Sequence, residues 1–306
     1  MLRSGVGRLI AWVTACAALA FVGYLLVEAW RELAVAVQQV EWPLIASGWA
    51  ISVGSAVANF MAFVLLLGPA RGGLSLGALG HLYFAGQLLK HLPGRVWGLA
   101  YQGAALTGRI GVGEWVSVNV AHILLGISFT VLICAGVVAT VWWVPAVAVI
   151  PLIGSALLIC AWREAPARWL LRHLGWLPTR VRHAIRDAMA TVMSRALRSR
   201  ARICLVFLSS WILYFCAWTL YARAYPGLDA WDGVRLSALY SIAWLVGYLA
   251  LITPSGLGIR EAVFAALAVS YPGEVVLYFS LLGRVALLAT DLALGLIFLR
   301  PRHEPT

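Results

Sequence analysis

Residues 251–261, LITPSGLGIRE, interrupt a long apolar segment near the end of the chain. Pro254 removes a backbone donor and disfavours helix for the residue before it, while Gly256 and Gly258 permit backbone angles that other residues avoid. The helix is therefore expected to break here and to leave backbone groups unpaired. Inside a bilayer such backbone is tolerated only where protein buries it or where it lines an aqueous cavity, so the break is a candidate site. The alternative is a helix-loop-helix turn in an interfacial loop.

The composition is that of an integral membrane protein. The chain has 306 residues, of which 62% are hydrophobic and 11% charged, and its mean hydropathy is +0.90. No polar stretch is long enough for a separate soluble domain, so we predict one all-α transmembrane domain over residues 1–306. The five cysteines lie in apolar runs without metal-ligand spacing, and we expect neither a metal nor a cofactor.

Six apolar segments have the length of a membrane span. They are residues 9–29, 43–68, 114–140, 145–162, 203–222 and 275–299. Two more apolar segments, residues 76–108 and 236–270, are interrupted near the middle, the first at Pro93 and Gly94 and the second at Pro254. We expect these two to form re-entrant helical hairpins.

The distribution of basic residues predicts the orientation. Of 23 Lys and Arg residues, a cytoplasmic N-terminus places sixteen inside and three outside, provided that neither hairpin crosses the membrane. Ten of the arginines lie in the loop 163–202, whose first part, residues 163–177, has a basic amphipathic pattern. We expect both termini in the cytoplasm and this loop against anionic head groups. A nucleic-acid role is poorly supported, because the chain offers no soluble binding module.

The order of segments suggests an inverted repeat. Residues 43–140 and 203–299 each contain a span, a hairpin and a span, and the two sets begin on opposite sides of the membrane. Inverted repeats with broken helices indicate transporters with a site near the bilayer midplane. The alternative is that any six-span chain can be divided to look symmetric.

Ionisable residues inside the membrane each cost about 2.5–3.5 kcal/mol even on the gentler scales, so they need partners or water. The candidate substrate-binding residues are four cations and two carboxylates: Lys90, Arg95, Arg260, Glu261, Arg284 and Asp291. This excess of positive charge favours an anion, and a phosphate head group fits arginine well. The alternative is structural: Arg284 pairs with Asp291, Arg260 pairs with Glu261, and Lys90 extends to the interface.

Two other polar residues, Asn119 and His122, share a face of the third full span and are expected to hydrogen-bond between helices. The sequence contains no Ser-His-Asp order, zinc-protease motif, phosphate-binding loop or dinucleotide fingerprint. We therefore expect no enzymatic activity.

Three segments carry a resemblance to a known family: GQLLKHLPGRVWG, TPSGLGIREAVFAAL and LLGRVALLATDLALG. They are similar to segments of the transmembrane, flippase-like domain of the lysylphosphatidylglycerol synthases, and the similarity covers most of the chain. By residue, the matches are Pro93, Gly94, Arg95, Pro254, Gly256, Gly258, Glu261 and Arg284. The resemblance implies a lipid-handling domain with two re-entrant regions in a bacterial or archaeal cytoplasmic membrane.

The chain also departs from the family pattern. Ser255 replaces the first glycine of a usual pair, Gly98 to Ala100 lack a usual acidic residue, and Ala121 and His122 replace a charged pair. We expect a stand-alone member without the aminoacyl-transferase domain. The predicted function is translocation of an anionic or amphipathic lipid, either aminoacylated or polyprenyl-phosphate-linked. The alternative is an enzyme or accessory subunit that acts on a lipid-linked saccharide beside envelope-biosynthesis enzymes.

Overall fold

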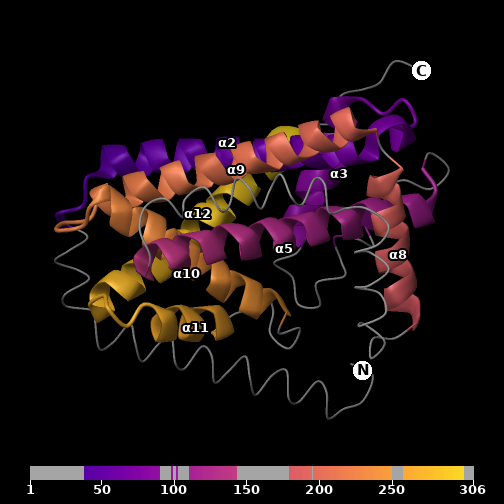
Figure 1. Ribbon diagram of the computed structural model, residues 1–306. Coiled ribbons are helices and arrows are strands. Elements are labelled where there is room, and N and C mark those ends of the chain that lie inside the picture. Colours follow the sequence, from indigo (N-terminus) through magenta and orange to yellow (C-terminus); the bar gives the residue numbers. More distant parts are fainter. Residues whose placement is uncertain are drawn as a thin grey trace, which may run out of the picture. The chain divides into compact units, whose positions relative to one another are not determined.

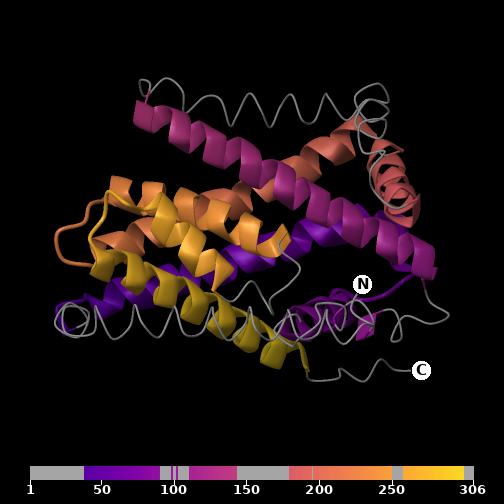
Figure 2. The same ribbon diagram turned by 90° about the horizontal axis from the view of Figure 1, so that it is seen from below.

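The computed structural model describes residues 38–89, 98, 101–102, 110–142, 179–194, 196–249 and 258–299. In these ranges the ordered elements are helices joined by turns, with no strands (Figures 1 and 2). The predicted all-α class is confirmed for this part of the chain.

Eight α-helices and one short 3-10 helix are described. In chain order they are α2 (Trp42–Leu67), η1 (Gly68–Arg71), α3 (Leu76–Leu89), α5 (Val112–Trp142), α8 (Thr179–Met193), α9 (Leu197–Arg223), α10 (Ala230–Leu249), α11 (Ile259–Leu267) and α12 (Gly273–Leu299).

Four of these helices are long and apolar enough to cross a membrane. The stretches that qualify are Trp42–Leu67, Gly113–Leu132, Leu197–Arg223 and Gly273–Phe298. They coincide with four of the expected spans, in α2, α5, α9 and α12. The other two expected spans, residues 9–29 and 145–162, lie outside the described residues, so the total of six stays a prediction.

Both expected hairpins are described only in part. In the first, α3 forms the entering helix, and the break at Pro93 and Gly94 lies outside the described residues. In the second, α10 and α11 flank residues 250–257, which are also outside them. The 20-residue α10 begins at Ala230, six residues before the expected hairpin, and packs against α11. Helices on both sides of the break are therefore present in the second hairpin, and the re-entrant path of both hairpins stays a prediction.

The chain divides into two compact units. The first comprises residues 1–53, 87–98 and 214–296, and the second comprises residues 54–86, 99–213 and 297–306. Each unit takes segments from both predicted halves, 43–140 and 203–299. The inverted relation between those halves, and the single domain over residues 1–306, stay predictions.

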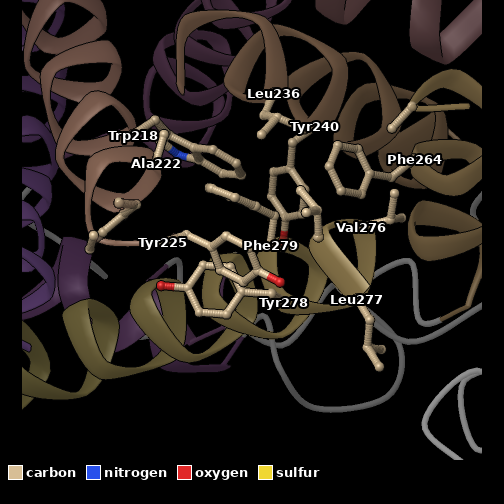
Figure 3. Close-up of a cluster of buried hydrophobic side chains, with 14 of the residues drawn as sticks. Trp218, Ala222, Tyr225, Leu236, Tyr240, Phe264, Val276, Leu277, Tyr278 and Phe279 are labelled. Atoms are coloured by element: carbon tan, nitrogen blue, oxygen red, sulfur yellow. The ribbon is translucent and has the colours of Figure 1, made fainter. Parts of the chain in front are cut away.

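The core of the first unit is an aromatic cluster from α9, α10, α11 and α12 (Figure 3). The Trp218 ring stacks on Phe279, with centroids 5.5 Å apart, and lies 4.9 Å from the Tyr240 ring. Phe264 of α11 meets Tyr240 edge-on at 5.4 Å. Offset and edge-on aromatic contacts stabilise such packing beyond the area they bury. This cluster holds the short helix α11 against α10 and α12 and thereby fixes the residues at its beginning.

The second unit contains the predicted polar pair Asn119 and His122. His122 donates from Nε2 to the carbonyl oxygen of Asn59 on α2, at 3.3 Å, so its predicted interhelical bond is present. Asn119 instead donates to the carbonyl of Trp115 within its own helix, at 2.9 Å. The His122 ring lies 5.6 Å from Phe63, in an aromatic environment that suits a packing role.

Part of the basic loop is also helical. In α8 the side chains of Ala188 and Val192 are buried while His183 and Arg186 are exposed, and the helix packs against α5. The predicted amphipathic segment, residues 163–177, lies outside the described residues. Contact of this loop with anionic lipid stays a prediction.

Candidate functional site

The beginning of α11 is built on a glycine and a carboxylate. Gly258 precedes the helix with a φ of 78°, a conformation that residues with a Cβ rarely adopt. Its backbone amide donates to Oε2 of Glu261 at 2.8 Å, and its carbonyl accepts the amide of Ala262 at 2.8 Å. A carboxylate in the first turn caps an unpaired amide and interacts favourably with the helix dipole. Gly258 and Glu261 therefore define where the helix starts after the predicted break.

Glu261 is also held by an arginine from α12. Arg284 donates from Nε to Oε1 at 2.6 Å and from Nη2 to Oε2 at 2.7 Å. Paired parallel bonds of this kind are the strongest arrangement between guanidinium and carboxylate. The Arg284 side chain keeps 26% of its surface exposed, whereas that of Glu261 keeps 4%. These two hydrogen bonds between Arg284 and Glu261, called the fork below, join the beginning of α11 to the middle of α12.

Arg260 is held much less tightly than Arg284. It is 3% exposed, and its Nε donates to Oε1 of Glu261 at 3.2 Å. Its guanidinium carbon lies 5.0 Å from the centroid of the Tyr240 ring, a cation-π contact. In the described part of the chain, this hydrogen bond is the only one that its side chain makes. Among the described residues, Arg260 is thus a buried cation held by one hydrogen bond and one cation-π contact.

The charges of this cluster do not balance. Arg260 and Arg284 contribute two positive charges, and Glu261 contributes one negative charge, with Arg260 and Glu261 buried. Coulombic interactions are several times stronger in a buried site than in water. An excess positive charge at the beginning of a helix is an arrangement that favours an anion, because the helix dipole acts in the same direction.

Tyr240 lies beneath Arg260 and was not identified from the sequence. Its side chain is 6% exposed, and its hydroxyl has no hydrogen-bond partner among the described residues. A Cβ added at Gly283 would lie 2.6 Å from Cζ and 2.7 Å from the hydroxyl oxygen of Tyr240, so only glycine allows this approach. A buried hydroxyl without a partner costs about 1–3 kcal/mol. No motif points to Tyr240, although the glycine directly before Arg284 marks the place where its ring meets α12.

Of the other predicted site residues, the structure describes only Asp291. Asp291 is buried on α12. Arg284 bonds to Glu261, and two helical turns, about 10 Å along the axis, separate positions 284 and 291. Lys90, Arg95, Pro93, Gly94, Pro254 and Gly256 lie outside the described residues. Within the described ranges, no group of three or more His, Cys, Asp or Glu side chains is placed to hold a metal ion.

Comparison with known families identifies the chain. The sequence model described as "Lysylphosphatidylglycerol synthase TM region" matches residues 9–295. The chain belongs to this family. No curated protein and no solved structure matches it. The family resemblance predicted from the sequence is therefore confirmed, and the chain is a multi-pass membrane protein of a family associated with lipid-related processes.

The structure gives three of the positions matched to the lysylphosphatidylglycerol synthase TM-region family a common role. Gly258, Glu261 and Arg284, each matched to the family segments from sequence alone, are joined by hydrogen bonds through one carboxylate. The motif therefore encodes a brace between two helices. Arg260, inside the same segment, is the charged residue that this brace leaves weakly engaged.

Proposed function

We propose that this membrane protein moves a lipid with an anionic head group between leaflets, and that Arg260 binds the lipid phosphate. One observation carries the proposal. Arg284 occupies both oxygens of Glu261, and Arg260 is left buried, charged and held by one longer hydrogen bond. The structural alternative pairs Arg260 with Glu261 and Arg284 with Asp291. The first pair is present at 3.2 Å, but Glu261 is bound more closely by Arg284, at 2.6 Å.

Phosphate is the anion that best fits this arrangement. A guanidinium offers paired donors that match two phosphate oxygens, and the first turn of a helix adds a favourable dipole. A monoanionic phosphate would neutralise the excess charge of Arg260, Glu261 and Arg284. A neutral head group would leave that charge unbalanced in a buried place, and a cationic group would add to it. The lipid source follows from the family and from the apolar helix α12 that carries Arg284.

Transport also requires that the side chain that binds the lipid phosphate can release it. Arg260 can exchange its 3.2 Å bond to Glu261 for a phosphate oxygen at small cost, since Glu261 keeps its fork with Arg284 and its bond from Gly258. The brace then holds α11 in place whether or not lipid is bound. Separate residues thus serve the fold and the ligand.

Reconstitution tests the proposal. Purified protein is placed in vesicles with head-group-labelled phosphatidylglycerol, phosphatidylcholine or a polyprenyl phosphate, and an impermeant quencher reports how fast label leaves the inner leaflet. We expect faster movement of at least one anionic lipid than in protein-free vesicles. Equal rates with and without protein for all three lipids would contradict the proposal.

A second assay separates transport from the enzymatic alternative. The protein is incubated in detergent with a radiolabelled polyprenyl-linked saccharide, where no leaflets exist. A transporter forms no product under these conditions. Product formation would favour an enzyme acting on the lipid-linked saccharide.

A further inference from the structure

We propose that the hydroxyl of Tyr240 donates a hydrogen bond to the phosphate bound by Arg260, which makes Tyr240 a specificity-determining residue of the site. This inference rests on the proposed function and deepens it. It adds a neutral donor from α10 to a site otherwise formed by α11 and α12.

The position of the hydroxyl supports this role. The ring of Tyr240 lies under the guanidinium of Arg260, and its hydroxyl lies against Gly283, the residue directly before Arg284. The group is within electrostatic range of Arg260, Glu261 and Arg284. A donor in this place lies on the ring that Arg260 covers and beside the residue that precedes Arg284, so it is near both arginines.

The chemistry of the side chain points the same way. The rings around Tyr240 belong to Trp218 and Phe264 and give it apolar contacts (Figure 3). Phenylalanine would make the same contacts without burying an unsatisfied donor, since Tyr240 finds no hydrogen-bond partner among the described residues. Among the described residues, the hydroxyl therefore adds no hydrogen bond to this conformation. An acceptor supplied by a ligand would satisfy it.

Binding of a phosphate would change the contact between Arg260 and Tyr240. The guanidinium covers the ring and is fixed by one hydrogen bond of 3.2 Å. When a phosphate binds Arg260, the guanidinium moves from Glu261 toward the ligand and uncovers the ring beneath it. Tyr240 then donates its O–H to a phosphate oxygen, a charge-assisted bond stronger than one between neutral groups.

Three variants in detergent test the inference: Tyr240→Phe, Arg260→Gln and the matched control Tyr278→Phe. Tyr278 has a buried hydroxyl without a hydrogen-bond partner in the described residues, and its ring lies beside Tyr225 in the same aromatic cluster (Figure 3). The probe is short-chain phosphatidylglycerol with a fluorescent acyl tail, measured by polarisation. Diacylglycerol with the same tail reports binding that does not depend on phosphate.

We expect Tyr240→Phe to weaken phosphatidylglycerol binding roughly tenfold to a hundredfold, with diacylglycerol binding unchanged and the melting temperature equal or higher. Tyr278→Phe should match it in stability and keep wild-type affinity.

Wild-type affinity in Tyr240→Phe, together with weaker phosphatidylglycerol binding in Arg260→Gln, would overturn the inference and leave the proposed function standing. Wild-type affinity in Arg260→Gln would overturn the proposed function. A lower melting temperature in Tyr240→Phe, or an equal loss in Tyr278→Phe, would make the hydroxyl structural and also overturn the inference.

Discussion

Glu261 on α11 and Arg284 on α12, 23 residues apart in the chain, are joined by two hydrogen bonds of 2.6 and 2.7 Å. The same carboxylate accepts the amide of Gly258 and so fixes the beginning of α11. One buried side chain therefore sets both the start of a helix and its packing against the next one. Arg260, the neighbour of Glu261 in sequence, is a minor partner.

Breaking the fork should destabilise the fold. In either Glu261→Gln or Arg284→Gln one charge loses its partner, and we expect a loss of about 3 kcal/mol, at the lower end for buried pairs because Arg284 is partly exposed. The double variant should recover much of this loss. Thermal melting in detergent measures all three, and single variants as stable as the wild type would show that the fork contributes nothing.

The close approach between Gly283 and Tyr240 predicts that no side chain larger than that of glycine fits at position 283. In Gly283→Ala the new methyl group would press on the Tyr240 ring, and overpacking of this kind costs about 1–3 kcal/mol. The matched control is Gly273→Ala on the same helix, where an added Cβ meets nothing within 4 Å. We expect a lower melting temperature for the first variant only. Similar melting temperatures for the two would contradict the tight contact.

Tyr271, in the turn before α12, should make the folded state less stable at alkaline pH. The Tyr271 hydroxyl donates to Oδ1 of Asp232 at 3.0 Å, and burial, followed by this bond, raises the pKa of Tyr271 to about 12. The unfolded phenol has a pKa of about 10, so the contribution is present below about pH 10 and is lost as the pH rises toward 12. Between pH 9.5 and 11.5, the melting temperature of Tyr271→Phe should therefore decrease less than that of the wild type. Equal decreases in melting temperature for the two proteins would show that Tyr271 does not contribute to the loss of stability at high pH.

Orientation is tested at Ser199, an exposed residue in the first turn of α9. In a variant without the native cysteines, Ser199→Cys should resist an impermeant maleimide in intact spheroplasts and react once the membrane is opened. The reason is the ten arginines of residues 163–202, which favour the cytoplasmic side. Labelling in intact cells would reverse the predicted topology.

Local patterns in the sequence predicted much of this structure. The length of apolar segments located α2, α5, α9 and α12. A helix break was predicted within residues 251–261, and α11 begins in this stretch, at Ile259. The pairing of charges was harder to predict, because it depends on how α11 packs on α12. Spacing along the sequence suggested Arg260 with Glu261 and Arg284 with Asp291. The structure contains the first pair at 3.2 Å and adds a closer, unpredicted pair between Arg284 and Glu261.

Tyr240 shows a second limit of sequence analysis. An aromatic residue in an apolar helix is usually a packing residue, and nothing in its spacing connects it with Arg260. Its interest comes from two structural facts, the guanidinium over its ring and the absence of a hydrogen-bond partner among the described residues.

The central claim is that Arg260 binds the lipid and that the Arg284–Glu261 fork holds the fold. The most direct test compares Arg260→Gln with the double variant Arg260→Gln/Glu261→Gln, measuring melting temperature and lipid movement in vesicles. We predict that Arg260→Gln melts near the wild type and loses at least tenfold in rate, and that the double variant restores nothing. A drop in melting temperature that the double variant repairs, with transport returning alongside it, would contradict the account.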